Sequence, residues 1–173
     1  AFRATKEPVF LQGAREAGLA LARAQNPDGG FSRTAEIGAR PPEKRLPSTF
    51  DDDTTQAALR FLMRTDQALR FQNSGIHESV EYALSSVLKA QYPNGAWPQG
   101  YDQFSDPEKS PVKKASYPDT WTRTWPGSGQ YWFRYTLNDN ALATTIETLF
   151  DAERIYADTA AGANFNRLAA QCR

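Results

Sequence analysis

The stretch STFDDDTTQAALRFL (Ser48–Leu62) places three consecutive aspartates, Asp51, Asp52 and Asp53, at the start of a helical pattern. Apolar residues then recur at three- and four-residue spacing, which predicts a helix over about 52–71. One aspartate in the first turn would cap such a helix by accepting backbone N–H bonds. Three adjacent carboxylates also repel one another, so a bound cation is the alternative interpretation of the run.

The same spacing of apolar residues predicts three further helices, over about 8–25, 75–91 and 139–158. Strand-like alternation is nearly absent, so the chain is predicted to be all-α. The connections over 26–50 and 92–138 are much longer than the roughly 2–8 residues of ordinary helix connections. If consecutive helices run antiparallel, both long connections emerge at the same end, which we expect to be the working face.

The chain also repeats itself. LARAQNPDGGF (21–31) resembles VLKAQYPNGAW (87–97) at an offset of 66 residues, and TFDDDTTQAALRFL resembles TLNDNALATTIETL at an offset of 87. Each copy predicts a helix, a tight turn, a long loop, a polar cluster and a second helix. Two such helical hairpins, over about 8–71 and 75–158, predict a partial α/α barrel or toroid domain across 1–173, with too few units to close a ring.

The second copy carries Asn138, Asp139 and Asn140 where the first carries its three aspartates. Both clusters offer oxygen-bearing side chains without His or Cys, and that chemistry suits a hard cation such as calcium and suits zinc poorly. Capping remains the simpler explanation of either cluster alone. Two clusters in register at one end of a helical bundle favour a shared cation or polar site.

Cationic and aromatic side chains are mixed in the long connections, which suits an acidic carbohydrate because apolar rings pack on sugar faces and cations bind carboxylates. A solvated surface without a role is the alternative interpretation. The residues are Arg33, Arg40, Lys44, Arg45, Lys109, Lys113, Lys114, Arg123 and Arg134, with Trp97, Tyr101, Tyr117, Trp121, Trp125, Tyr131 and Trp132.

Composition narrows the classes of function. Lys and Arg number 20 and Asp and Glu also number 20, so no charge excess favours nucleic acid or an anionic membrane. No apolar run is long enough to span a bilayer, which predicts a soluble chain. The single cysteine, Cys172, excludes an internal disulfide. The single histidine, His77, is expected to be a surface turn residue, which argues against Ser–His–Asp catalysis.

Several of these segments resemble the motifs of the pectate lyases of polysaccharide lyase family ten. AQYPNGAWPQGY and FRYTLNDNA are similar to that family's Gln-x-Pro-x-Gly-x-Trp-Pro and Tyr-Thr-Phe-Asn-Asp motifs, STFDDDTTQ to its Thr-Ile-Asp-Asn-x-x-Thr segment, and QNPDGGFSR to its Gly-Gly-Trp-Pro-Lys turn. The resemblance covers roughly 21–153. It implies an (α/α)₃ toroid that cleaves polygalacturonate by calcium-assisted β-elimination, in a secreted or periplasmic protein.

The resemblance also implies roles for individual residues. Asp51 and Asp139 match acidic residues at the family's calcium and substrate carboxylate, and Asp52 stands where the family usually has Asn. Implied substrate-binding residues are Arg33, which replaces the family's Lys, Arg134, Trp97 and Thr55.

The family's catalytic base is an arginine in the C-terminal half of the toroid, so the resemblance implies that a chain ending at Arg173 is the N-terminal part of such an enzyme. No catalytic residue is assigned, and the 173 residues alone are expected to be incomplete or inactive. A non-catalytic module that binds calcium or an acidic polysaccharide is the second interpretation. A helical scaffold whose aspartates act only as caps is the third.

Overall fold

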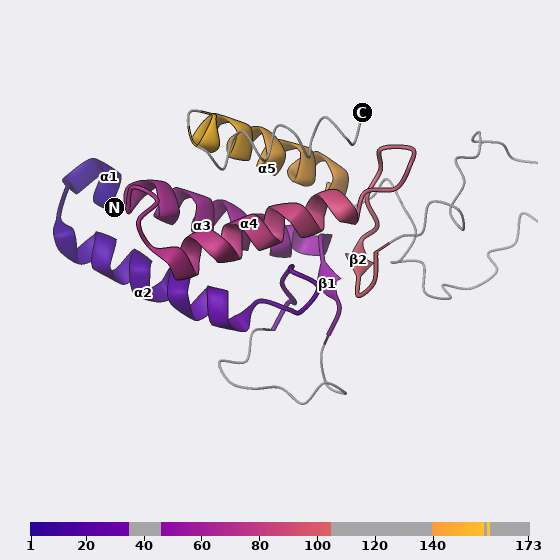
Figure 1. Ribbon diagram of the computed structural model, residues 1–173, viewed down its shortest axis with the longest axis horizontal. Helices are drawn as coiled ribbons and strands as arrows, with labels where there is room; N and C mark the ends of the chain where they lie inside the picture. Colours follow the sequence, from indigo (N-terminus) through magenta and orange to yellow (C-terminus); the bar gives the residue numbers. More distant parts are fainter. Residues whose placement is uncertain (35–45, 105–139, 158, 160–173) are drawn as a thin grey trace, which may run out of the picture.

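A computed structural model describes residues 1–34, 46–104, 140–157 and 159. The helices in these ranges are α1 (Phe2–Thr5), α2 (Pro8–Ala24), α3 (Thr54–Ala68), α4 (Ser74–Lys89) and α5 (Ala141–Tyr156). The remaining elements are the 3₁₀ turn η2 (Asp51–Asp53) and two short strands, β1 (Ser48–Thr49) and β2 (Gly100–Tyr101). The described part of the chain is therefore all-α, as the apolar spacing predicts (Figure 1).

The four long helices lie close to their predicted positions, and local chemistry explains where they begin. Pro8 is the first residue of α2, where its missing N–H costs no hydrogen bond. Asn73 caps α4 by accepting a hydrogen bond from the backbone N–H of Ile76, at 3.1 Å. The predicted helix over 52–71 is shorter at both ends, because η2 precedes it and because Arg70 and Phe71 adopt positive φ after it.

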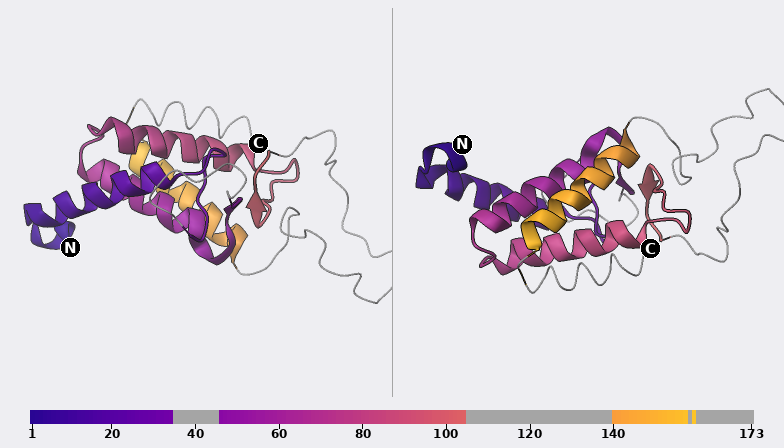
Figure 2. Two further views of the ribbon diagram at one scale, coloured as in Figure 1. Left: turned by 90° about the horizontal axis from the view of Figure 1, so that it is seen from below. Right: turned by 90° about the horizontal axis from the view of Figure 1, so that it is seen from above.

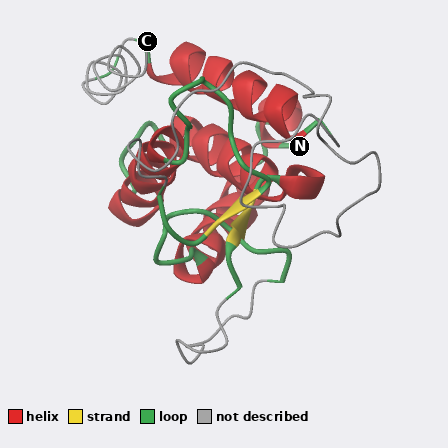
Figure 3. Ribbon diagram, turned by 90° about the vertical axis from the view of Figure 1, so that its right-hand side faces the viewer, coloured by secondary structure: helices red, strands yellow, loops and turns green. Residues whose placement is uncertain are grey.

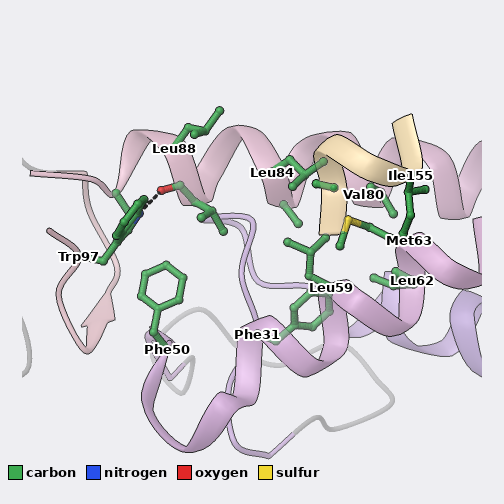
Figure 4. Packing of buried hydrophobic residues seen from close by; sticks show 14 of the residues in the cluster. Phe31, Phe50, Leu59, Leu62, Met63, Val80, Leu84, Leu88, Trp97 and Ile155 are labelled. Carbon is green, nitrogen blue, oxygen red and sulfur yellow. Dashed lines mark hydrogen bonds between the residues drawn. The ribbon is translucent and has the colours of Figure 1, made fainter. Parts of the chain in front are cut away.

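Helix α3 is the centre of the packing. It contacts α2, α4 and α5, and the views in Figures 1 and 2 show α5 running alongside it. Leu59 and Met63 of α3 are fully buried and point toward Val80 and Leu84 of α4 (Figure 4). The apolar stripe predicted for α4 is buried along its whole length, so the α3–α4 contact forms a large part of the core of the described structure.

The apolar stripes predicted for the other helices are buried less completely. Phe10 on α2 is 44 % exposed, and on α5 both Ile146 and Phe150 are exposed. Leu21, Leu142 and Leu149 pack against the core while partly exposed. Among the described residues, no helix combines the length and the apolar content that a membrane crossing would need.

The described parts of the two long connections meet at one end of the helices. Strands β1 and β2 pair antiparallel, with Ser48 opposite Tyr101 and Thr49 opposite Gly100. Figure 3 views the molecule from this end and shows the two strands side by side. The sequence predicts that both connections emerge at the same end, and the strand pairing agrees with that expectation.

The two tight turns of the repeat share one hydrogen-bond pattern. The side-chain amide of Gln25 donates to the carbonyl of Gly29 at 2.8 Å, and that of Gln91 donates to the carbonyl of Gly95 at 2.9 Å. The two glycines also share an unusual backbone, with φ of 87° and 84°. The sequence repeat at an offset of 66 residues is therefore accompanied by a structural repeat.

His77 is not the exposed turn residue that the sequence suggested. It lies in the first turn of α4, and its Nδ1 is 2.8 Å from Oδ2 of Asp66, whose side chain is fully buried. The hydroxyl of Tyr156 donates to the same Asp66 oxygen at 2.7 Å. One carboxylate on α3 thus links α4 and α5, and the expectation failed because the partner of His77 lies on another helix.

Tyr101 is buried, and its hydroxyl has no hydrogen-bond partner among the described residues. The neighbouring hydroxyl of Ser48 donates its proton to Oδ1 of Asp28 instead. Gly30 makes this close packing possible, since a Cβ at that position would lie 2.5 Å from both hydroxyl oxygens. Burial, and then the nearby Asp28 charge, raise the pKa of Tyr101 above its ordinary value.

The turn glycines provide a matched test of the packing. Gly95→Ala should cost about 1–2 kcal/mol, because alanine at positive φ is strained. Gly29→Ala should cost about 1–3 kcal/mol more, because its Cβ would also lie 2.6 Å from Cβ of Ser86 on α4. Urea unfolding of both variants measures the difference. Equal losses of stability would contradict the close approach of the first turn to α4.

The raised pKa of Tyr101 predicts a specific loss of stability in alkali. The hydroxyl ionises near pH 10.0 in the unfolded chain and at higher pH in the folded protein. Its contribution to the free energy of unfolding is therefore complete below pH 10 and falls as the pH rises above 10. The loss should be about 1.4 kcal/mol per pH unit. Tyr101→Phe should keep its stability at pH 7 and lose less between pH 10 and 11. Unfolding at both pH values measures this, and an unchanged alkaline slope would contradict it.

Candidate functional site

The aspartate run is positioned by the residue before it and by the paired connection. Phe50 is fully buried, with its ring 5.2 Å from that of Tyr101. Its backbone N–H donates to the carbonyl of Gln99 at 2.7 Å, and the hydroxyl of Thr49 donates to the same carbonyl at 2.9 Å. Because Phe50 anchors in the core while Gln99 holds its backbone, Asp51 emerges at the end where the connections meet.

The aspartates do not cap α3 in the way that the simpler interpretation predicts. Asp53 is the N-cap residue of α3, but its carboxylate makes no capping hydrogen bond. Asp52 and Asp53 instead have left-handed backbone conformations, with φ of 51° and 59°. Asn140, the counterpart of Asp53 at an offset of 87 residues, has φ of 57°. Asp and Asn tolerate this region better than most residues, at a cost of about 1–2 kcal/mol each.

Two arginines from this chain supply the positive charge among the aspartates. One guanidinium nitrogen of Arg33 pairs with Oδ2 of Asp51 and lies 2.9 Å from Oδ2 of Asp52. Arg60 of α3 pairs with Oδ2 of Asp53 and donates to the hydroxyl of Thr148 on α5 at 2.8 Å. The two pairs differ in setting, since the Arg33 side chain is 56 % exposed and that of Arg60 is 21 % exposed.

Thr55 and Trp97, two of the predicted substrate-binding residues, lie inside the fold. Thr55 is fully buried, and its hydroxyl bonds both the N–H and the carbonyl of Phe31, at 3.1 and 3.2 Å. Trp97 is 5 % exposed, and its indole N–H donates to the carbonyl of Val87 at 2.7 Å (Figure 4). Their positions argue for holding the turns in place and against direct contact with a ligand.

Gln56 is an organising residue that the sequence analysis missed. It is 1 % exposed, and its amide nitrogen donates to the carbonyl of Phe50 at 2.8 Å and to the hydroxyl of Thr144 on α5 at 3.0 Å. Its side-chain carbonyl oxygen is buried and has no hydrogen-bond partner in the part of the chain that the structure describes. The TTQA stretch alone does not predict a structural role for this glutamine. Its partners lie on α5, beginning with Ala141, which is 85 residues further along the chain.

The described residues provide only some of the ligands that a metal ion needs. Asp51 and Asp52 offer hard oxygen donors, which suit calcium in chemistry. Within the ranges that the structure describes, no group of three or more His, Cys, Asp or Glu side chains could hold a metal ion. Asp139 and Arg134, the other predicted metal and substrate residues, lie outside the described residues. The described donors therefore form at most part of a calcium site.

The chain was compared with protein families, with curated proteins and with solved structures. Residues 26–171 match the family described as pectic acid lyase. Neither the curated proteins nor the solved structures gave a match. The family match includes Asn26–Gly30 of the first tight turn, the whole second turn and both polar clusters, and with them the aspartates and Arg33. On that match, covering most of its length, the chain belongs to the pectic acid lyase family.

Proposed function

We propose that this chain is part of a secreted pectate lyase that cleaves polygalacturonate by calcium-assisted β-elimination. The observation that carries the proposal is the placement of Asp51, Asp52 and Arg33 together, at the end where the two connections meet, in a member of the pectic acid lyase family. An acidic polysaccharide needs cations for its carboxylates, and a calcium ion needs anionic oxygens. This group of side chains offers both.

The charges of this group are accessible to a large ligand. The side chains of Arg33 and Asp52 are 56 % and 69 % exposed. Exposed ion pairs of this kind contribute only about 0–1 kcal/mol, so exchanging their partners costs little. Arg33 can therefore turn from the aspartates to a uronate carboxylate, leaving Asp51 and Asp52 as oxygen donors.

In this proposal Asp51, Asp52 and Asp139 hold the calcium ion, and Arg33 and Arg134 bind substrate carboxylates. Bound calcium would neutralise a uronate carboxylate and make the neighbouring C–H more acidic. Thr55 and Trp97 act indirectly, by fixing the turns that present Arg33 and the second connection. The base that removes the proton is not assigned to a residue of this chain.

The two hairpins are proposed to be consecutive units of an α/α toroid. The support is the repeat itself: the same turn pattern and the same left-handed residue before the second helix occur in both copies. A base from another part of the toroid would complete the reaction. We therefore expect these 173 residues to bind calcium and oligogalacturonate without cleaving them. A non-catalytic binding module is the second candidate, and it predicts the same binding.

Calcium binding tests the proposed role of the aspartates. Asp51→Asn combined with Asp52→Asn should weaken calcium binding at least tenfold, measured by calorimetric titration, because two anionic donors become neutral amides. Asp151→Asn is the matched control, since Asp151 is also an aspartate that pairs with arginine side chains, those of Arg64 and Arg154, and lies on α5 away from the aspartate run. The control should bind like the wild type. Equal affinities in all three proteins would refute calcium binding at this group.

Substrate binding and cleavage are separated by a second pair of measurements. Arg33→Gln should weaken the binding of trigalacturonate in the presence of calcium by about tenfold, because a charge-assisted hydrogen bond is lost. Ultraviolet absorbance of unsaturated products, with and without chelator, measures cleavage by the wild-type chain. Chelator-sensitive release of such products by these 173 residues would show that the base lies within them.

A further inference from the structure

One guanidinium group lies between two aspartates of the candidate site. A single nitrogen of Arg33 pairs with Oδ2 of Asp51 and is 2.9 Å from Oδ2 of Asp52. Calcium binds carboxylate oxygens at about 2.3–2.6 Å. An ion held by these two oxygens together therefore needs the space that the Arg33 nitrogen occupies. The chain's own cation and a calcium ion compete for the same pair of oxygens.

Of the two arginines beside the aspartates, Arg33 is the one that can be exchanged. The side chains of Arg33 and Asp52 are both more than half exposed, and an exposed ion pair is broken at little cost. Arg60 is mostly buried and holds both Asp53 and the hydroxyl of Thr148 on α5. Releasing Arg60 would break a contact between two helices, so its role is structural.

The backbone that carries this ion pair is anchored on both sides, so the exchange needs only side chains to move. The N–H of Asp51 donates to the hydroxyl of Thr49 at 3.1 Å. Two residues before Arg33, the N–H and the carbonyl of Phe31 both bond the hydroxyl of Thr55. The carboxylate and the guanidinium therefore start from the same two fixed points, whichever partner each of them binds.

We propose that Arg33 couples calcium binding to uronate binding, by exchanging the aspartates for a carboxylate of the substrate. Without calcium, Asp51 and Asp52 hold the guanidinium and keep it from an acidic sugar. When the two carboxylates bind calcium instead, Arg33 is free for the uronate. When Arg33 binds a uronate, the two carboxylates are free for calcium. Each ligand tightens the binding of the other by the same factor. This inference rests on the proposed function, and it adds the coupling between the two ligands.

Removing Arg33 tests one direction of the exchange. In the absence of sugar, Arg33→Gln should bind calcium about threefold more tightly than the wild type, because an exposed ion pair no longer has to be broken. Arg64→Gln is the matched control, since Arg64 is similarly exposed and pairs with Asp151 on α5. The control should bind calcium like the wild type. Calorimetric titration measures the three affinities.

Removing the aspartates tests the other direction without calcium. With chelator present, Asp51→Asn combined with Asp52→Asn should bind trigalacturonate about threefold more tightly than the wild type, because Arg33 is no longer held. The loss of two negative charges also favours an acidic sugar. A variant that carries Arg33→Gln in addition separates these causes. Without Arg33, the two Asn substitutions should raise the affinity for the sugar by a smaller factor.

Two results would overturn the coupling and leave the proposed function standing. The first is that Arg33→Gln binds calcium no more tightly than the wild type does. The second is that the two Asn substitutions raise the affinity for trigalacturonate equally with and without Arg33. If the wild type binds no calcium or no trigalacturonate, the proposed function itself fails, and the coupling fails with it.

Discussion

The buried hydroxyl of Thr55 joins the parts of the molecule on which the candidate site depends. It bonds both the N–H and the carbonyl of Phe31, and thereby fixes the turn after α2 to the first turn of α3. The carbonyl of Phe31 also accepts the N–H of Thr49 at 3.0 Å. Arg33 lies two residues beyond one side of this junction, and Asp51 two residues beyond the other. Their ion pair is a consequence of how the two backbones are held together.

Much of this arrangement could be predicted from the sequence, because it is encoded locally. Apolar spacing predicted the long helices, and the Gln-x-Pro-x-Gly pattern predicted two similar turns. The meeting of the two connections followed from antiparallel helices of similar length. The helices and turns are predicted from residues within a few turns of one another, where periodicity and turn chemistry are reliable guides.

The contacts that the sequence did not reveal depend on how turns and helices pack against one another. Trp97 was predicted to bind substrate, yet it packs inside the fold, where its indole N–H donates to the carbonyl of Val87. Gln56 owes its role to Thr144 of α5. The aspartates were read as caps or cation ligands, whereas Arg33 and Arg60 already stand beside them. Local sequence patterns do not show which arginine pairs with which carboxylate, even where the two are only seven residues apart, as Asp53 and Arg60 are.

The two copies of the repeat show how these charges belong together. At the offset of 66 residues Arg33 corresponds to Gln99, and at the offset of 87 residues Arg60 corresponds to Glu147. The second copy thus lacks both arginines, and it also has asparagine in place of Asp51 and Asp53. The second copy therefore has two fewer arginines and two fewer aspartates at these positions than the first copy. This is expected if Arg33 and Arg60 neutralise the aspartates of the first copy. Asp52 and Asp139 are the carboxylates common to both copies. Both copies therefore keep one carboxylate at this position. The two further aspartates of the first copy, Asp51 and Asp53, are accompanied by two further arginines, Arg33 and Arg60.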